Sequence, residues 1–421
     1  MIDKNSRPKL GLSEAILGLF LLISGLSLLI ADNFWLGFYD FLKLLELAGL
    51  FLYVKYNFWR LFNLARFWQV FIASAAIQGI IGVVQFSQQK SLGLKFLWES
   101  PLAPDMAGVA KIIVGGEKII RAYGLAPHPN ILAMILMVAI FGVIYLFIKN
   151  FSIGADPSNA GCEIPRLRLG MTKKRIDRLL FAAVFVLLLA ALFFTFSRSV
   201  ILIGFASLIV WLLMACKSAS LRKPILAIFI LLFIVNCLLL IVFWPYAAAR
   251  FNPADLSGSQ SITLRALYNQ TALDLVKESP FLGIGLGNFV SVFSQQYHLF
   301  QNWLFQPVHN IYLLIAAETG LLGLLAFLAF LFFTLKSVWL QRNNPFITYH
   351  LSLIAFLLVI GFTDHFFWTL QQGQLIFWLF LGILAAISHL EPRTRINSVR
   401  DQLREGSLAN ASKISPCSSA D

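Results

Sequence analysis

Long apolar runs separated by short polar or basic segments alternate along almost the whole chain. A membrane-spanning helix needs about 20 residues, rising about 1.5 Å per residue, to cross about 30 Å of hydrocarbon. By this measure the sequence predicts ten spans, with twelve as the alternative count. The predicted spans are residues 12–31, 34–54, 67–86, 129–148, 179–196, 199–215, 225–243, 310–335, 347–363 and 367–389.

The polar segments between these runs predict the organisation of the chain. We expect residues 1–390 to form one all-α polytopic membrane domain. Segments 87–128 and 244–309 are predicted to be outward-facing periplasmic loops, the second of them large and partly helical. The segment 150–178 is predicted to be a basic inner loop. The Ser-rich, charged segment 391–421 has little apolar periodicity and is predicted to be a disordered cytoplasmic tail.

Composition and charge support a membrane protein. The chain is 59% hydrophobic and only 13% charged, whereas soluble domains are about 25% charged. Its formal net charge of +13 comes largely from short segments between apolar runs, as the positive-inside rule requires, so no nucleic-acid partner is expected. The same rule predicts that both termini are cytoplasmic, and the basic loop is expected to contact anionic lipid. The first apolar run is too long for a signal-peptide core and is interpreted as a span.

Common nucleotide and metal motifs are absent. The chain has no Walker A sequence, no dinucleotide fingerprint in a strand–helix context and no HExxH, so no cofactor and no metal site are expected. The glycine-rich segment 283–287 does not follow a predicted strand. Its glycines instead predict a tight turn in which the backbone closely approaches a partner.

Two arginines are the candidate anion-binding groups. Arg198 lies in the Ser-Arg-Ser turn between two predicted spans, where a charge is costly unless it meets water or an anion. Arg265 lies in a segment that predicts the start of a helix ending before Pro280. Guanidinium groups match phosphate oxygens in bidentate geometry, so both are candidates for diphosphate binding. Arg250 is a supporting candidate, and a snorkelling arginine is the structural alternative for Arg198.

His309 is the candidate general base. It ends the arginine-bearing outer segment, faces outward on the predicted topology, and an imidazole pKa near 6.5 suits proton removal at neutral pH. The alternative is a polar cap at the start of the eighth span. Asn310 is a supporting candidate. Glu318 is also a candidate, but about nine residues of helix place it about 13 Å deeper, so we expect it to satisfy a neighbouring helix.

Other polar residues are candidates of lower rank. In the first outer segment these are Arg121, Tyr123 and His128, for which loop and helix-cap chemistry is the alternative. The pair Asp364-His365 is interpreted as interface polarity. In the second predicted span, three charged residues are interpreted as a salt-linked stripe facing the bundle. They are Asp40, Lys43 and Glu46.

The chain resembles the O-antigen ligase and polymerase family of bacterial membrane glycosyltransferases over about residues 120–335. The strongest match is His309-Asn310 followed, after nine residues, by Gly320-Leu-Leu-Gly323. The other segments that carry the resemblance, in chain order, are Tyr123-Gly124 to His128-Pro129-Asn130, Thr195-Phe-Ser197-Arg198-Ser199, and Leu264-Arg265 to Pro280-Phe-Leu-Gly283-Ile-Gly285-Leu-Gly287-Asn288-Phe289. The better-known ligases have about twelve spans, so the resemblance does not determine the helices on either side of the matched region.

The resemblance implies a metal-independent, inverting transfer of a glycan from undecaprenyl diphosphate at the periplasmic face of a bacterial inner membrane. It places Arg198 and Arg265 on the diphosphate and His309 on the acceptor hydroxyl. The acceptor, whether lipid, glycan or protein, is not determined, so ligase, polymerase and protein O-glycosylation remain alternatives. A transporter of inorganic carbon and a scaffold for polysaccharide assembly are alternatives of other classes.

Overall fold

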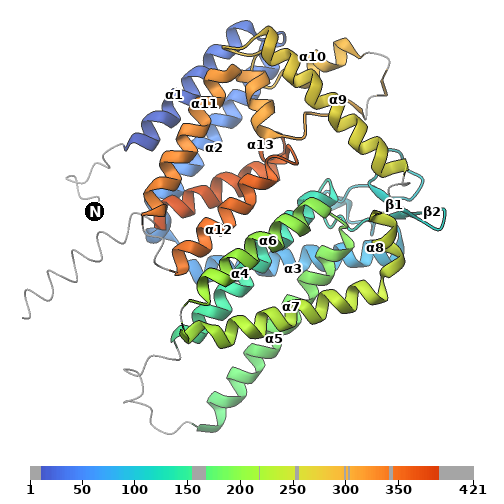
Figure 1. The fold of residues 1–421 in the computed structure, drawn as a ribbon, viewed down its shortest axis with the longest axis vertical. Coiled ribbons are helices and arrows are strands. Elements are labelled where there is room, and N and C mark those ends of the chain that lie inside the picture. Colours follow the sequence, from blue (N-terminus) through green and yellow to red (C-terminus); the bar gives the residue numbers. More distant parts are fainter. Residues whose placement is uncertain are drawn as a thin grey trace, which may run out of the picture.

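A computed structural model of the chain describes residues 11–153, 167–217, 219–251, 256–297, 300–301, 304–340 and 345–387. Regular structure in these ranges is almost entirely helical (Figure 1), so the all-α prediction is confirmed. The helices are α1 (Leu12–Leu26), α2 (Phe34–Leu61), α3 (Leu64–Gln88), α4 (Pro129–Ile153), α5 (Leu167–Phe194), α6 (Arg198–Ala215), α7 (Arg222–Val242), α8 (Trp244–Phe251), α9 (Leu256–Glu278), α10 (Phe289–Gln296), α11 (Ile311–Trp339), α12 (Pro345–Ile360) and α13 (Phe366–Thr369), followed by a last helix at Gln371–Ile387.

Several helices have the length and apolarity of membrane spans. Six in the described part of the chain qualify: Leu12–Ile30, Leu64–Gln88, Pro129–Lys149, Arg198–Ala215, Arg222–Val242 and Ile311–Trp339. Three shorter apolar helices coincide with predicted spans; they are Leu179–Phe194, Ile347–Ile360 and Gln371–Ile387. The multi-span class is therefore confirmed, while the count of ten or twelve stays a prediction.

The second predicted span coincides with α2, which carries charges along its length. Lys43 and Glu46 are linked by a salt bridge of 3.0 Å, as expected. The expected bundle-facing stripe is wrong, however, because Glu46 is exposed and Lys43 is partly so. Asp40 instead lines an internal cavity.

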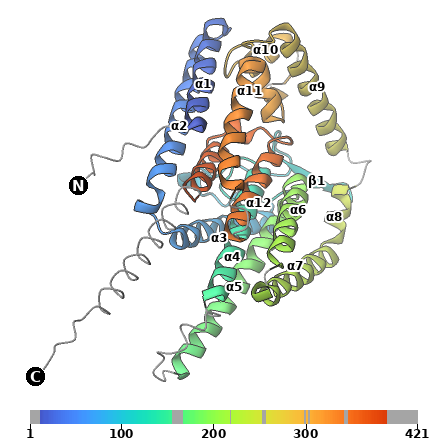
Figure 2. The same cartoon turned by 60° about the vertical axis from the view of Figure 1, so that its left-hand side comes forward.

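Packing places α4 at the centre of the helical bundle. Within its apolar window 83% of residues are buried, against 22% in α7. The neighbours of α4 are α3, α5 and α6, and α12 packs beside α6 (Figure 1). A second group, in which α1 packs along α11, stands beside this core, and Figure 2 shows α2 next to α1. Because α4 is central and begins at Pro129, the polar residues at its start, His128 and Asn130, are partly buried where several segments meet.

The two predicted outer segments contain short elements of their own. In the first, β1 (Lys111–Val114) and β2 (Glu117–Ile120) form an antiparallel hairpin with Val114 opposite Glu117. Its two-residue turn, Gly115-Gly116, has φ values of 58° and 90°, which glycine adopts without strain. The second segment contains α8, α9 and α10. In Figure 1, α9 runs from the α10–α11 end of the molecule to α8 and the hairpin.

The structure extends some helices beyond the predicted boundaries. The chain was expected to form a loop over 150–178, but α4 continues to Ile153 and α5 begins at Leu167. Residues 154–166 and the predicted tail at 391–421 lie outside the described residues. The helix that carries Arg265 ends at Glu278, just before Pro280 as predicted, but it begins earlier than expected, at Leu256.

The glycine-rich segment packs against a break in α11. Gly320 has φ 73° inside α11, a value that interrupts the helix and favours glycine. The freed backbone groups pair with the loop: Leu321 N–H donates to the Pro280 carbonyl at 2.8 Å, and Ile284 N–H donates to the Ala317 carbonyl at 2.9 Å. A Cβ on Gly283 would lie 2.5 Å from the Ala317 oxygen. The expected close approach of backbone is therefore present, and its partner is α11.

Candidate functional site

Several chain segments meet at the start of α4. The turn between α5 and α6 brings Arg198, and the strand β2 leads directly into Arg121. The segment before α11 brings His309, and the connection after α12 brings Asp364 and His365. These residues are far apart in the sequence, and only the packing of the helices places them together.

Two imidazoles and one carboxylate form a cluster within the site. Nδ1 of His309 lies 3.6 Å from Oδ1 of Asp364. The rings of His309 and His365 are 4.8 Å apart, centroid to centroid. Nδ1 of His309 is buried and has no other partner, so Nε2 is the nitrogen left to accept a proton. At 3.6 Å the contact with Asp364 is longer than a hydrogen bond and would tighten as the imidazole gains a proton.

Asn130 connects this carboxylate to the rest of the site. Its Nδ2 donates to Oδ2 of Asp364 at 2.8 Å. Its Oδ1 accepts from Nη2 of Arg121 at 2.9 Å and from Oγ of Ser197 at 3.0 Å. Asn130 lies in the first turn of the central helix α4, so one side chain links the α5–α6 turn, the residue after strand β2 and the Asp364 segment.

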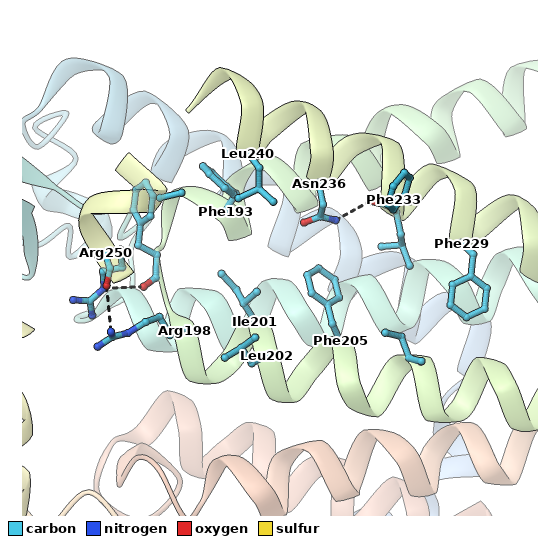
Figure 3. A pocket seen from close by; sticks show the side chains of 14 residues that line it. Phe193, Arg198, Ile201, Leu202, Phe205, Phe229, Phe233, Asn236, Leu240 and Arg250 are labelled. Carbon is cyan, nitrogen blue, oxygen red and sulfur yellow. Dashed lines mark hydrogen bonds between the residues drawn. The ribbon is translucent and has the colours of Figure 1, made fainter. Parts of the chain in front are cut away.

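Arginines surround the network and are anchored by backbone carbonyls. Nη1 of Arg198 donates to the carbonyl of Arg250 at 3.2 Å, and Nε of Arg250 donates to the carbonyl of Phe196 at 3.4 Å (Figure 3). Nε of Arg121 donates to the Thr195 carbonyl at 2.5 Å. These bonds hold the guanidinium groups of three arginines around the α5–α6 turn.

Arg265 reaches the site from α9. Its Nη1 donates to the Thr363 carbonyl at 3.2 Å, next to Asp364. Its Nε is buried with no hydrogen-bond partner. A buried N–H group without an acceptor costs about 1–3 kcal/mol, so this donor would gain from a bound anion.

The pKa values record crowding of positive charge. Burial and the charges of three neighbouring arginines lower the pKa of Arg121 to about 9. The three neighbours are Arg250, Arg198 and Arg265. All four guanidinium groups are therefore within electrostatic range of one point, and an anion placed among them would be stabilised.

The pKa values of His365, His128 and Asp364 all lie below their ordinary values, for different reasons. Burial lowers the pKa of His365 to about 4, and burial together with the charge of Arg121 lowers that of His128 to about 3. Burial alone would raise the pKa of Asp364, but the contact with His309 and the charges of the other imidazoles hold it below its usual range. Asp364 is therefore ionised at neutral pH.

The other candidate residues have defined structural contacts. Asn310 caps α11, because its Oδ1 accepts from the Tyr312 and Leu313 N–H groups at 3.0 and 3.1 Å. The cap at the start of α11 is thus Asn310 rather than His309. His128 accepts the Asn130 N–H at its Nδ1 (3.2 Å), which is the predicted cap chemistry. The Tyr123 hydroxyl accepts the Ala110 N–H at 2.6 Å and pins the outer hairpin.

Glu318 does not contact the imidazoles. Its Oε2 accepts from Nε1 of Trp368 at 3.1 Å, and its Oε1 accepts the Phe289 N–H at 3.5 Å. It therefore satisfies neighbouring elements, as predicted from its depth in the span.

His309, Asp364 and His365 also have the spacing of a metal site, since one ligand atom from each lies within 4.8 Å of the others. Several of these atoms already face hydrogen-bonding groups. Asp364 accepts the His365 N–H at 2.9 Å as well as the Asn130 amide, and Nδ1 of His365 is 2.6 Å from Oγ1 of Thr369. We interpret the cluster as a hydrogen-bonded base assembly.

An elongated apolar groove leads away from the arginines. It is a cavity of about 490 Å³ between α6 and α7, with Arg198 and Arg250 at one end (Figure 3). Its walls include Leu202, Phe205 and Phe233, and Asn236 is the one polar uncharged residue among its lining. We call it the apolar groove. It pairs a positively charged end with a long hydrophobic body.

Sequence reasoning missed the importance of Asp364 and Asn130. Asp364 was interpreted as interface polarity, and Asn130 appeared only as part of a helix start. The available signal for both was their place at the ends of predicted spans, facing the same side as His309. That signal applies equally to capping residues, so it does not single them out.

Several helices of spanning length surround a cluster of two imidazoles, one carboxylate and four arginines, which places the chain in the class of polytopic helical membrane proteins. The family model described as O-Antigen ligase matches residues 183–328, and this match supports assignment of the region to that family. The match includes Arg198, Arg265 and His309 but ends before Asp364. A comparison with curated proteins finds no significant match.

Proposed function

We propose that the protein transfers a glycan from undecaprenyl diphosphate to an acceptor hydroxyl at the periplasmic face of a bacterial inner membrane. The observation that carries this proposal is a group of four guanidinium groups linked through Asn130 to one imidazole–carboxylate pair. The family match supports glycan transfer, and the geometry supports a diphosphate leaving group. The proposal includes ten spans with both termini in the cytoplasm.

The arginines bind the donor diphosphate. Arg198 and Arg265 present N–H donors to its oxygens, and Arg121 and Arg250 add positive charge nearby. The apolar groove supports a lipid-linked donor, because its charged end and hydrophobic body match a diphosphate joined to an isoprenoid chain. Membrane lipid completes the surroundings of the tail.

His309 removes the proton from the acceptor. Its Nε2 takes the hydroxyl proton while the acceptor oxygen attacks the anomeric carbon, and Asp364 stabilises the imidazolium that forms. The bond between that carbon and the diphosphate oxygen breaks, so the configuration inverts. Lipid diphosphate leaves with both electrons of that bond, and the guanidinium groups stabilise its charge. The energy is stored in the donor, so no ATP is required.

The deciding experiment uses purified protein in lipid nanodiscs with an undecaprenyl-diphosphate oligosaccharide and candidate lipid, glycan and protein acceptors. Release of lipid diphosphate coupled to acceptor glycosylation is the readout. His309→Ala should abolish transfer, whereas His350→Gln, a buried histidine of α12, should retain it as a matched control. Transfer should continue in excess EDTA. Undiminished transfer by His309→Ala would remove the base from the mechanism, and solute uptake without any glycan donor would favour a transporter.

A further inference from the structure

A second cavity is lined by residues that neighbour the imidazole cluster in sequence. It has a volume of about 310 Å³, at the lower end of small-molecule sites, and lies between α2, the start of α10, α11 and α13. Its walls mix apolar groups with polar ones. The lining residues on which the argument depends are Asp40, Val290, Pro307, Glu318, Trp368 and Thr369. We call it the carboxylate cavity.

The charge of this cavity is opposite to that of the apolar groove. Asp40 and Glu318 line it, and its described lining contains no basic side chain. Glu318 is only 4% exposed. Among the described residues, the Asp40 carboxylate has neither a hydrogen bond nor a salt bridge. A diphosphate would be repelled here, whereas carboxylate oxygens accept hydrogen bonds from hydroxyl groups.

The cavity adjoins the proposed base. Pro307 lies two residues before His309, and Thr369 Oγ1 is 2.6 Å from Nδ1 of His365, whose ring contacts His309. Asp40 lies about two helical turns after the start of α2, and Glu318 about two turns after the start of α11. The carboxylate cavity thus reaches residues that contact the imidazole cluster.

We infer that the carboxylate cavity binds an uncharged, hydroxyl-bearing part of the acceptor, such as a neutral sugar unit. That this ligand is the acceptor rests on the proposed function, whereas the binding of a neutral glycoside does not. Separate cavities of opposite charge would keep the anionic donor and the neutral acceptor in their own places. The carboxylate cavity should therefore exclude acceptors whose docked part is phosphorylated.

Protection of a single cysteine tests the site without any transfer reaction. In a variant whose four native cysteines are replaced by serine, Val290→Cys places a thiol in the cavity wall. The protein is reconstituted in nanodiscs, and the rate of maleimide labelling is measured with octyl β-glucoside below its micellar concentration or with octyl phosphate. The glucoside should slow labelling at least threefold, and octyl phosphate should not. A Leu202→Cys reporter in the apolar groove is the matched control. There the glucoside should not slow labelling more than octyl phosphate does.

Two charge-removing variants then assign the protection to the carboxylates. Asp40→Asn and Glu318→Gln keep side-chain size, and each should raise the glucoside concentration for half-protection at least fivefold, with labelling in the absence of ligand unchanged. Four outcomes would each overturn the inference. They are equal protection by both probes, protection by octyl phosphate alone, no protection by either probe, and glucoside protection that is unchanged in both variants. A failed His309→Ala result would overturn the proposed reaction and leave this binding result standing.

Discussion

Oδ1 of Asp364 lies 3.6 Å from Nδ1 of His309, although the two residues come from segments on either side of α11 and α12. The contact is held from both directions. Asn130 and the His365 backbone amide donate to the carboxylate, and α11 begins immediately after His309 with Asn310 as its cap. The pairing turns one nitrogen of the imidazole, Nδ1, toward a carboxylate.

Asp364→Asn should lower glycan transfer about 100-fold, because general-base catalysis contributes about 10²–10⁴-fold and an amide cannot stabilise the imidazolium. The KM for the lipid-linked donor should change little, since the arginines remain. Initial rates over a pH series would measure both the loss and any displacement of the pH profile. Wild-type rates and an unmoved profile would make Asp364 a structural residue only.

Arg198→Lys and Arg265→Lys should each reduce donor use at least 10-fold, because an ammonium group keeps the charge but loses the bidentate fork. Arg222→Lys is the matched control, since Arg222 is exposed at the start of α7 and its Nε donates to the Cys216 carbonyl at 3.1 Å. Kinetics at varied donor concentration would separate binding from turnover. Equal behaviour of all three variants would show that charge alone is sufficient.

Leu202→Trp should obstruct the apolar groove and reduce use of a full-length undecaprenyl donor several-fold, while a donor with a short tail should be affected less. Overfilling a cavity costs about 1–3 kcal/mol, which corresponds to about 5- to 150-fold in an equilibrium. Leu213→Trp is the control, because Leu213 lies on α6, is 59% exposed and does not line the groove. If chain length makes no difference in Leu202→Trp, the tail lies elsewhere.

Stability should fall as the pH decreases from about 6.5 to about 4. Burial lowers the pKa of His365 to about 4 in the folded protein, whereas an unfolded histidine has a pKa of about 6.5. Between these values the unfolded chain binds more protons, so acid favours unfolding. Protonation of Asp364 affects stability only at lower pH, because its lowered pKa keeps the carboxylate ionised between pH 4 and 6.5.

The loss from His365 would be about 3 kcal/mol at most, at about 1.4 kcal/mol per pKa unit. Thermal unfolding in nanodiscs at several pH values measures it. His365→Asn should flatten the slope between pH 4 and 6.5, and His128, whose pKa is also lowered by burial, should account for part of the remainder. An unchanged slope in His365→Asn would show that this histidine titrates normally in the folded protein.

The sequence predicted the local features of the site well. The end of α9 before Pro280, the turn that carries Arg198 and the helix that begins after His309 all follow from capping residues, proline and apolar periodicity. These signals act within a few residues of one another, so a linear pattern contains them. The same is true of the glycines at 283–287, although the sequence did not identify α11 as their partner.

The sequence alone determined that the chain is a helical membrane protein, because apolar runs of spanning length can be satisfied only by helices in a bilayer. It also supplied the arginines, the histidine and the motif that the family match contains. Only the tertiary structure decided that Asp364 and Asn130 join His309. It also decided that Lys43 and Glu46 lie on the surface of the bundle, and that Asp40 and Glu318 line the same cavity. Those relationships depend on which helix faces pack together, and packing between residues so distant in the chain leaves no period or spacing in the sequence itself.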